Sequence, residues 1–176
     1  RLADDLPVRR ASLWGSAIAA ATYSDRALEE IRVLYTGALD AGQDRTTERS
    51  PKTTEHDRAR LHNQIVSAAT TRPEVLDMLL KLGVPAAGPT NGFDKTTLMY
   101  AAQQDQVASA RLLLAAGAEV NARTGENKQR CFQLERDNRS ALMYAAENAS
   151  EELIDLLLDA GANPKAQDTQ GNGVTW

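Results

Sequence analysis

The chain has 176 residues, of which 42% are hydrophobic and 25% are charged, with a formal net charge of −4. This hydrophobic content excludes a chain that is disordered throughout, and we find no basic stripe of the kind that nucleic-acid-binding domains usually carry. No stretch approaches the roughly 18 consecutive apolar residues that a membrane span requires.

The first third of the chain predicts two helices followed by a polar loop. Residues 13–21 and 24–41 carry helical patterns, and Gly42 is expected to end the second helix. Because a terminal repeat must present one polar face to water, we interpret residues 1–56 as degenerate N-terminal capping helices plus a polar loop. The loop, residues 43–57, has the composition of a flexible connection.

One phrase recurs in the rest of the chain. Residues 98–102 (LMYAA) recur 44 positions later as residues 142–146, and residues 65–69 (IVSAA) are a weaker copy 33 positions earlier. Residues that repeat in register over this distance indicate a solenoid of stacked helix pairs. The interval of 44 residues is 11 longer than the interval of 33. We place these 11 extra residues as an insertion within residues 123–137.

Each strong copy is followed by a leucine-rich second helix and a glycine, in residues 112–117 (LLLAAG) and 156–161 (LLLDAG). Glycine is favoured just beyond a helix end, while proline and serine are favoured at helix starts, so Pro73 and Ser150 should begin second helices. Helices this short are marginal alone in water and depend on packing. The glycines expected at helix ends are Gly42, Gly83, Gly117 and Gly161, and the leucines expected in the core are Leu113, Leu114, Leu157 and Leu158.

These segments resemble ankyrin repeats, whose first helix opens with Thr-Pro-Leu-His-x-Ala. Residues 96–102 and 140–146 match this opening, although both replace the family's Pro and His. Residues 117–122 and 161–164 resemble the closing loop of the family's repeat, and residues 168–172 resemble the tip of the next hairpin.

The resemblance implies an all-α fold, an ankyrin-repeat solenoid of stacked helix-turn-helix units with hairpin-like loops and extended loop insertions between repeats. It covers residues 57–172 and, with the N-terminal cap, predicts a single continuous solenoid domain. The repeats are expected at about residues 57–92, 93–135 and 136–168, with the start of a further repeat at 169–176.

The same resemblance implies a surface for a protein partner. In ankyrin repeats, partners usually meet the concave face, which is built from hairpin tips and the exposed edges of the first helices. The candidate partner-binding residues are Phe93, Lys95, Gln103, Gln104, Arg123, Arg130, Phe132, Arg136, Asp137, Arg139, Glu147 and Asn148. Further positions on these edges and tips are Thr70, Thr71, Gly92, Thr169, Gln170 and Asn172. The alternative for the whole set is an ordinary solvated surface.

Two features of this surface have alternative interpretations. Phe93 lies in a hairpin tip, where it either anchors a partner or folds back onto the neighbouring repeat. The insertion within residues 123–137 either contacts a partner, since insertions in repeat proteins often lie on the binding face, or is a neutral extension. Tyr100 and Tyr144 recur in register, which favours framework packing over binding.

Catalysis and metal binding are poorly supported by the sequence. His56 and His62 lie six residues apart, a spacing that does not place two ligands on one helical face, and no phosphate loop or nucleophile elbow is found. The single cysteine, Cys131, excludes an intramolecular disulfide and a cysteine-rich zinc site. We therefore expect no catalytic residues, no metal, no cofactor, no small-molecule substrate and no nucleic-acid partner.

The sequence thus favours a non-enzymatic module that binds a protein partner on its concave face, with a bacterial immunity or accessory protein as a more specific version. The alternative is a regulatory or targeting domain of a larger enzyme, truncated near Trp176. The lone thiol slightly favours the cytoplasm, while the bacterial periplasm or secretion are also compatible with it.

Overall fold

The computed structural model describes residues 21, 22, 24, 26–43, 69–84, 86, 94–125 and 138–174. The chain divides into two compact units, residues 1–84 and 85–176, which we describe separately. Six helices are described, in chain order α2 (Leu28–Gln43), α4 (Pro73–Lys81), α5 (Thr97–Gln103), α6 (Val107–Ala115), α7 (Ala141–Asn148) and α8 (Glu151–Asp159). The described residues form no strand, which confirms the all-α prediction.

In the first unit, α2 packs against α4. Ile31 and Tyr35 of α2 are buried, and α4 buries an apolar stripe that includes Leu76 and Leu79. Arg72, just before α4, is hydrogen-bonded to the chain that precedes α2: its Nη1 donates to the carbonyl oxygens of Thr22 (3.2 Å) and Arg26 (3.1 Å). Gly42 lies inside α2, so the expected helix end at that glycine is wrong; glycine adopts helical backbone angles as readily as left-handed ones.

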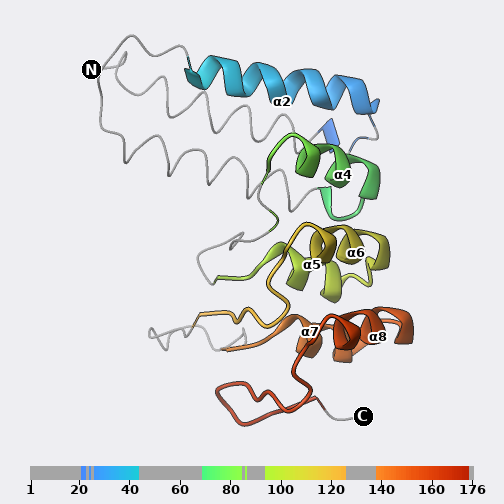
Figure 1. Ribbon diagram of the computed structural model, residues 1–176, viewed down its shortest axis with the longest axis vertical. Helices are drawn as coiled ribbons and strands as arrows, with labels where there is room; N and C mark the ends of the chain where they lie inside the picture. The colour runs from blue at the N-terminus through green and yellow to red at the C-terminus, as the bar shows by residue number, and fades with distance from the viewer. Residues whose placement is uncertain are drawn as a thin grey trace, which may run out of the picture. The chain divides into compact units, whose positions relative to one another are not determined.

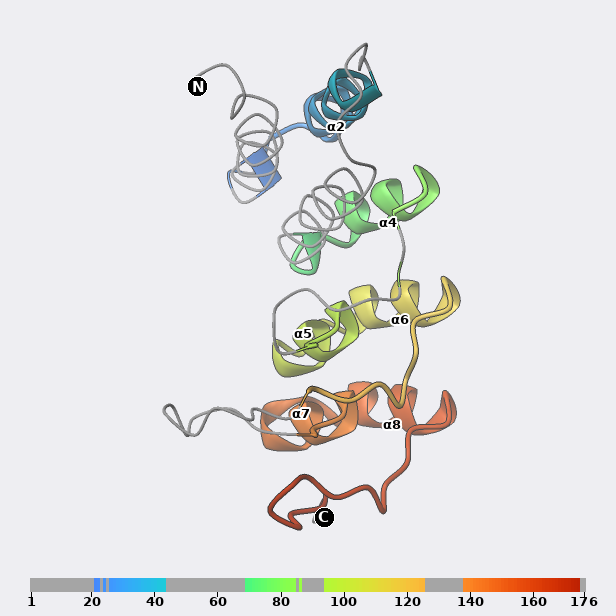
Figure 2. The same cartoon turned by 90° about the vertical axis from the view of Figure 1, so that its left-hand side faces the viewer.

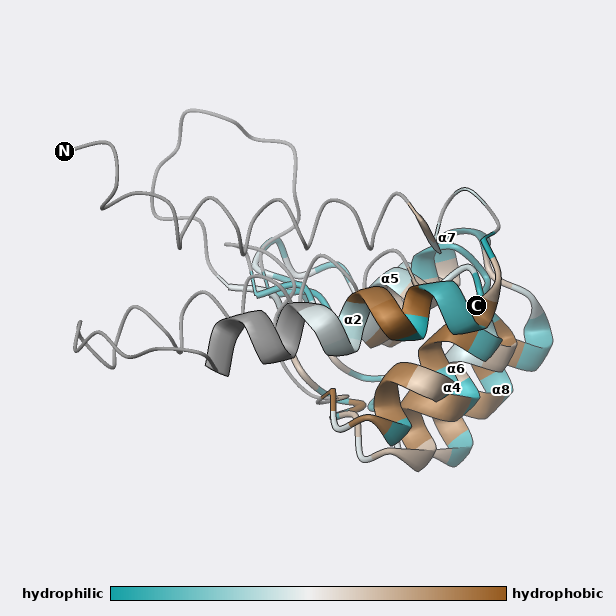
Figure 3. Cartoon of the chain, turned by 90° about the horizontal axis from the view of Figure 1, so that it is seen from above, coloured by the Kyte–Doolittle hydropathy of each residue, from teal (hydrophilic) through white to brown (hydrophobic). Residues whose placement is uncertain are grey.

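The second unit is a two-layer stack (Figures 1 and 2). The first helices α5 and α7 pack on each other, the second helices α6 and α8 do the same, and each first helix packs against its own second helix. Hydrophobic residues run along α6 and α8, whereas hydrophilic residues gather at the turns that precede these helices (Figure 3). The core of the stack lies between these layers and contains Leu98, Met99, Leu113, Leu142, Leu153 and Leu157.

Half of the leucines predicted for the core are fully buried. Leu113 and Leu157 have no exposed surface, as expected for core residues, whereas Leu114 and Leu158 are half-buried and lie at the edge of the core. An α-helix turns by about 100° per residue, which moves the next side chain from the centre of the interface to its flank.

The helix ends follow the predicted pattern in three of four cases. Gly83, Gly117 and Gly161 have φ angles of 91°, 88° and 89°, which confirms their role just beyond a helix end. At Gly117, the glycine N–H donates to Leu114 O (3.1 Å) and the next N–H donates to Leu113 O (2.9 Å). These two bonds satisfy carbonyl groups that the helix itself leaves without partners.

The helix starts at Pro73 and at Ser150, which precedes α8, are also confirmed. The first helices begin with hydroxyl caps: Thr96 Oγ1 accepts from Met99 N (3.3 Å) and Ser140 Oγ accepts from Met143 N (3.4 Å). A turn with a left-handed residue precedes each of these caps, with φ of 58° at Asp94 and 64° at Asn138. Equivalent turns therefore present equivalent side chains in successive repeats.

Candidate functional site

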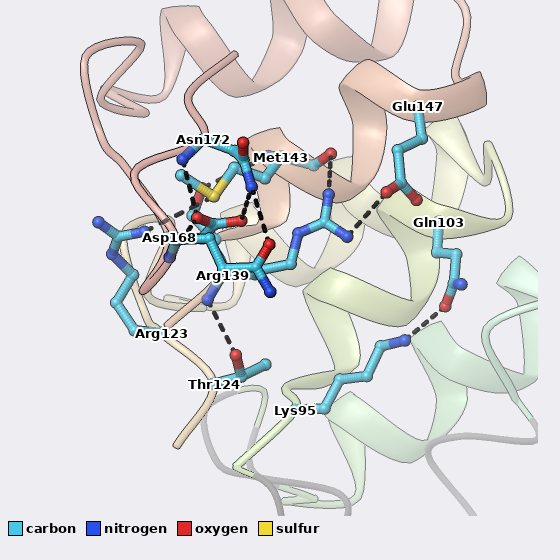
Figure 4. Close-up of polar contacts among 11 residues, drawn as sticks. Lys95, Gln103, Arg123, Thr124, Arg139, Met143, Glu147, Asp168 and Asn172 are labelled. Carbon is cyan, nitrogen blue, oxygen red and sulfur yellow. Dashed lines mark hydrogen bonds and ion pairs between the residues drawn. The ribbon is translucent and has the colours of Figure 1, made fainter. Parts of the chain in front are cut away.

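The residue just before each cap directs a cation onto the tyrosine of its first helix. Lys95 is buried, and its Nζ lies 4.4 Å from the ring centroid of Tyr100 and 4.3 Å from that of Tyr144 in the next repeat. The same ammonium group donates a hydrogen bond to Gln103 Oε1 (Figure 4). An ammonium ion between two ring faces is attracted by both quadrupoles, and the attraction grows as water is excluded.

Arg139 occupies the equivalent position 44 residues later and makes equivalent contacts. Its guanidinium carbon lies 4.8 Å from the Tyr144 ring centroid, and its Nη1 donates to Glu147 Oε1 at 2.7 Å. Its Nη2 donates to the carbonyl oxygen of Met143 (3.1 Å). The Arg139 side chain is 12% exposed, so most of this cation also lies inside the fold.

This arrangement corrects the prediction for Lys95 as an exposed hairpin residue. Lys95 is 7% exposed, and its ammonium group lies over the rings of Tyr100 and Tyr144 and not in solvent. Tyr144 is buried and Tyr100 half-buried, which agrees with framework packing for the two tyrosines.

The ends of the first helices remain open to solvent. Gln103 and Gln104 end or follow α5, and Glu147 and Asn148 end α7; all four are exposed. Gln103 and Glu147 are register equivalents and lie on the same side of the stack (Figure 4). Four predicted positions are therefore brought together as a polar edge, which we call the helix-end edge.

Arg123 lies at the base of the predicted insertion and joins successive hairpins. Its Nη1 donates to Asn138 O (2.6 Å) and its Nη2 donates to Gln167 O (3.2 Å). Beside it, Thr124 N donates to Arg139 O (3.0 Å) and Arg139 N donates to Thr124 Oγ1 (2.9 Å). The segments that flank the insertion, residues 123–124 and 138–139, are therefore hydrogen-bonded to each other. We call this feature the insertion stem.

The C-terminal hairpin is organised around Asp168. Its Oδ1 accepts from Gln170 N (2.8 Å) and Asn172 N (2.9 Å), and its Oδ2 accepts from the Asn172 side chain (3.1 Å). Burial raises the pKa of Asp168, but the hydrogen bonds from Asn172 and Gln170 and the positive charge of Arg139 together outweigh it, so the pKa lies below its ordinary value. The tip residues Thr169, Gln170 and Asn172 are exposed, in line with the predicted hairpin.

Other predicted residues fall elsewhere. Thr71 is exposed in the first unit, whereas Thr70 is buried and so cannot serve as an exposed helix edge. The remaining candidates lie outside the described residues: Gly92, Phe93, Arg130, Phe132, Arg136 and Asp137.

Two cross-repeat contacts were missed by sequence reasoning. Asp105 Oδ1, in the turn after α5, accepts from Ser150 N (2.9 Å) and Ser150 Oγ (2.7 Å) at the start of α8. Asn121 bonds both ways with the loop after α8, donating to Gly161 O (2.9 Å) and accepting from Asn163 N (2.9 Å). Turn-forming Asp and Asn were visible in the sequence, but which repeat each would contact was not.

Within the described part of the chain, no three His, Cys, Asp or Glu side chains gather closely enough to hold a metal ion. The described helices include none that is both long and apolar enough to cross a membrane.

Stacked helix pairs, left-handed turns before each first helix and glycine-capped second helices define a helical repeat protein. The family model for ankyrin repeats (3 copies) matches residues 65–168, more than half of the chain. The chain therefore belongs to the ankyrin-repeat family, whose repeats are protein-interaction modules and are generally non-enzymatic.

Among curated proteins, the chain is similar to an ankyrin repeat-containing protein of Treponema pallidum (strain Nichols). The two are 37% identical over 98 residues, which is 56% of this chain and 29% of the relative. The chain thus spans less than a third of the length of this bacterial relative.

Proposed function

We propose that this chain is a non-enzymatic interaction module that binds a protein partner across the concave face formed by its first helices and hairpins. The observation that carries the proposal is the helix-end edge, where equivalent polar residues of α5 and α7 face solvent side by side. Beneath this edge the framework is rigidly built from buried Lys95 and largely buried Arg139. A rigid scaffold with an exposed polar edge suits recognition, because little ordering is needed on binding.

The interaction is best tested by affinity capture from native lysate with mass spectrometry. The bait is the full chain, compared with a Gln104→Ala/Asn148→Ala variant that removes two side chains of the helix-end edge. We expect at least one protein to be captured by the wild-type chain and to fall about tenfold with this variant, which corresponds to about 1.4 kcal/mol of binding free energy.

A matched variant, Arg111→Ala/Asp155→Ala, removes two exposed side chains from the second helices α6 and α8. It should capture the same protein as the wild-type chain. Loss with this variant and retention with the edge variant would place the contact on the second helices instead, and the concave-face proposal would be wrong.

A more specific version of the proposal is an immunity or accessory role in a bacterium. The bacterial ankyrin relative supports the setting, although nothing in its name concerns immunity. The expected result is that the captured partner is a toxin encoded beside this gene and that co-expression of this chain protects cells from it. A partner encoded elsewhere, with no protection, would contradict this version.

The second candidate function is a regulatory or targeting segment of a longer enzyme. It is favoured by one observation, that the aligned region makes up 29% of the Treponema pallidum relative. The full-length gene decides between them, because a catalytic domain encoded in the same reading frame would replace the stand-alone proposal.

A further inference from the structure

The two described repeats of the second unit contain the same three-part arrangement. A cation before the helix cap lies over the tyrosine of its own helix and donates to the side chain at the exposed helix end. In the first copy the members are Lys95, Tyr100 and Gln103, and in the second they are Arg139, Tyr144 and Glu147. The cation and acceptor are eight residues apart in both copies, so the arrangement follows the repeat.

Each arrangement runs from the interior to the surface. Lys95 is 7% exposed, whereas Gln103, which accepts its hydrogen bond, is exposed. The Arg139 side chain is 12% exposed and that of Glu147 is 35% exposed. A cation held by a ring face and a tight turn has few alternative positions, so it restricts the rotamers of the surface side chain that it holds.

The neighbouring residue on each helix provides a contrast. The side chains of Gln104 and Asn148 are exposed, and neither makes a hydrogen bond to a residue that the structure describes. Each helix end therefore presents one anchored and one unanchored polar side chain. Because the same pairing occurs in two repeats, the anchoring is a property of the surface and not of a single contact.

We propose that Lys95 and Arg139 are positioning residues, which fix Gln103 and Glu147 in the orientation that a partner recognises. This inference deepens the proposed function and rests on it. Gln103 accepts from Lys95 through Oε1, which leaves its NH2 group to donate to the partner, while the Glu147 carboxylate is an acceptor only. The fitting partner surface therefore presents a carbonyl or carboxylate oxygen opposite α5 and an amide or cationic donor opposite α7.

The anchoring can be tested in the free protein by NMR relaxation of side-chain amides. We expect an order parameter above about 0.8 for the Gln103 NH2 group and below about 0.6 for that of Gln104, the adjacent unanchored glutamine. This comparison needs no substitution, so it does not depend on a variant that folds. Equal and low order parameters for the two glutamines would overturn the proposal.

Two substitutions then separate positioning from general packing. Lys95→Met keeps an unbranched side chain between the rings but removes the donor, so the Gln103 order parameter should fall to that of Gln104. Lys95→Arg should restore it, because Arg139 fills the same role in the next repeat. If Lys95→Met is folded and Gln103 stays ordered, Lys95 does not position it.

The same variants tested by capture distinguish this inference from the proposed function. Lys95→Met should lower capture of the partner several-fold and Lys95→Arg should recover it. Failure of the wild-type chain to capture any protein defeats the interaction proposal, whatever the order parameters are. Undiminished capture with an unanchored Gln103 defeats the positioning inference alone.

Discussion

At the scale of single residues, two basic side chains of the hairpins belong to the framework of the stack and not to its exposed surface. Lys95 and Arg139 look from the sequence like exposed basic residues of a binding face, yet both are inserted against tyrosine rings. Sequence spacing gives the repeat position of a residue but not the direction of its side chain, because a single left-handed turn at Asp94 or Asn138 redirects it. Their recurrence 44 residues apart was the signal that both belong to the framework.

Asp168 provides a prediction at this scale. Its pKa in the folded chain is lowered below the value of about 3.9 expected in an unfolded chain. The stability that it gives to the C-terminal hairpin is therefore present above about pH 4 and is lost as the pH falls through the folded-state pKa. A carbon-13 NMR titration of its carboxyl group should give a midpoint below 3.9, and Asn172→Ala should raise that midpoint. A midpoint above 4 in the wild-type chain would contradict this assignment.

At the scale of the helix, the short elements are stabilised by packing, and their ends are marked by local capping signals. Most caps could be predicted, since Pro73, Ser150 and the glycines after the second helices are local signals. The cap of α8 could be predicted only in part. Ser150 is present as expected, but its hydroxyl donates to Asp105 of the preceding repeat instead of capping its own helix.

Substitution of glycine by alanine should change the free energy of unfolding in opposite directions at a helix end and within a helix. Gly117→Ala forces a φ of 88° onto an L-residue and should lower the free energy of unfolding by about 1 kcal/mol or more. Gly37 lies inside α2 with no atom within 4 Å of an added Cβ, so Gly37→Ala should raise it by about 0.5–1 kcal/mol. Urea denaturation of both variants checks the pair, and similar shifts of the same sign would be inconsistent with the described backbone.

The cross-repeat cap gives a second prediction at this scale. Asp105→Ala removes the acceptor for Ser150 N and Oγ and should reduce stability by about 0.5–2 kcal/mol, the range seen for helix caps. Asp105→Asn keeps an oxygen acceptor and tolerates the φ of 52°, so it should retain most of the stability. As a control, Asp155→Ala on the exposed face of α8 should change stability by less than about 0.5 kcal/mol. Equal losses for Asp105→Ala and Asp155→Ala would mean that the cap contributes nothing.

At the scale of the whole molecule, the class of fold could be predicted from two copies of a five-residue phrase and the glycines that follow them. The positions of the repeats could be predicted because each repeat carries its own sequence signals and contacts mainly the neighbouring repeats. What could not be predicted is the set of side chains that join one repeat to the next, such as Asp105 with Ser150 or Asn121 with Gly161. Those contacts depend on the distance between stacked turns, which no local pattern specifies.

Uneven burial across the second unit predicts uneven local stability. Backbone amides in the middle of α5 and α7, where residues such as Ala101 and Ala145 are fully buried, should exchange slowest with solvent. Amides of the exposed C-terminal hairpin tip should exchange fastest among the described hairpin and helix positions of this unit. Hydrogen exchange followed by NMR gives the order directly, and faster exchange in α5 than in the tip would be incompatible with the stacked core.

The insertion stem at Thr124 and Arg139 also bears on how much the length of the inserted segment can vary. The two ends of the inserted segment are joined by backbone and side-chain hydrogen bonds, so the repeats on both sides keep their register whatever length of chain lies between them. Lengthening a loop whose ends are already closed costs little, about 0.6 kcal/mol for each doubling of its length. The stem is therefore a permissive graft point, where an epitope, a fluorophore or a foreign recognition loop can be installed without redesigning the scaffold.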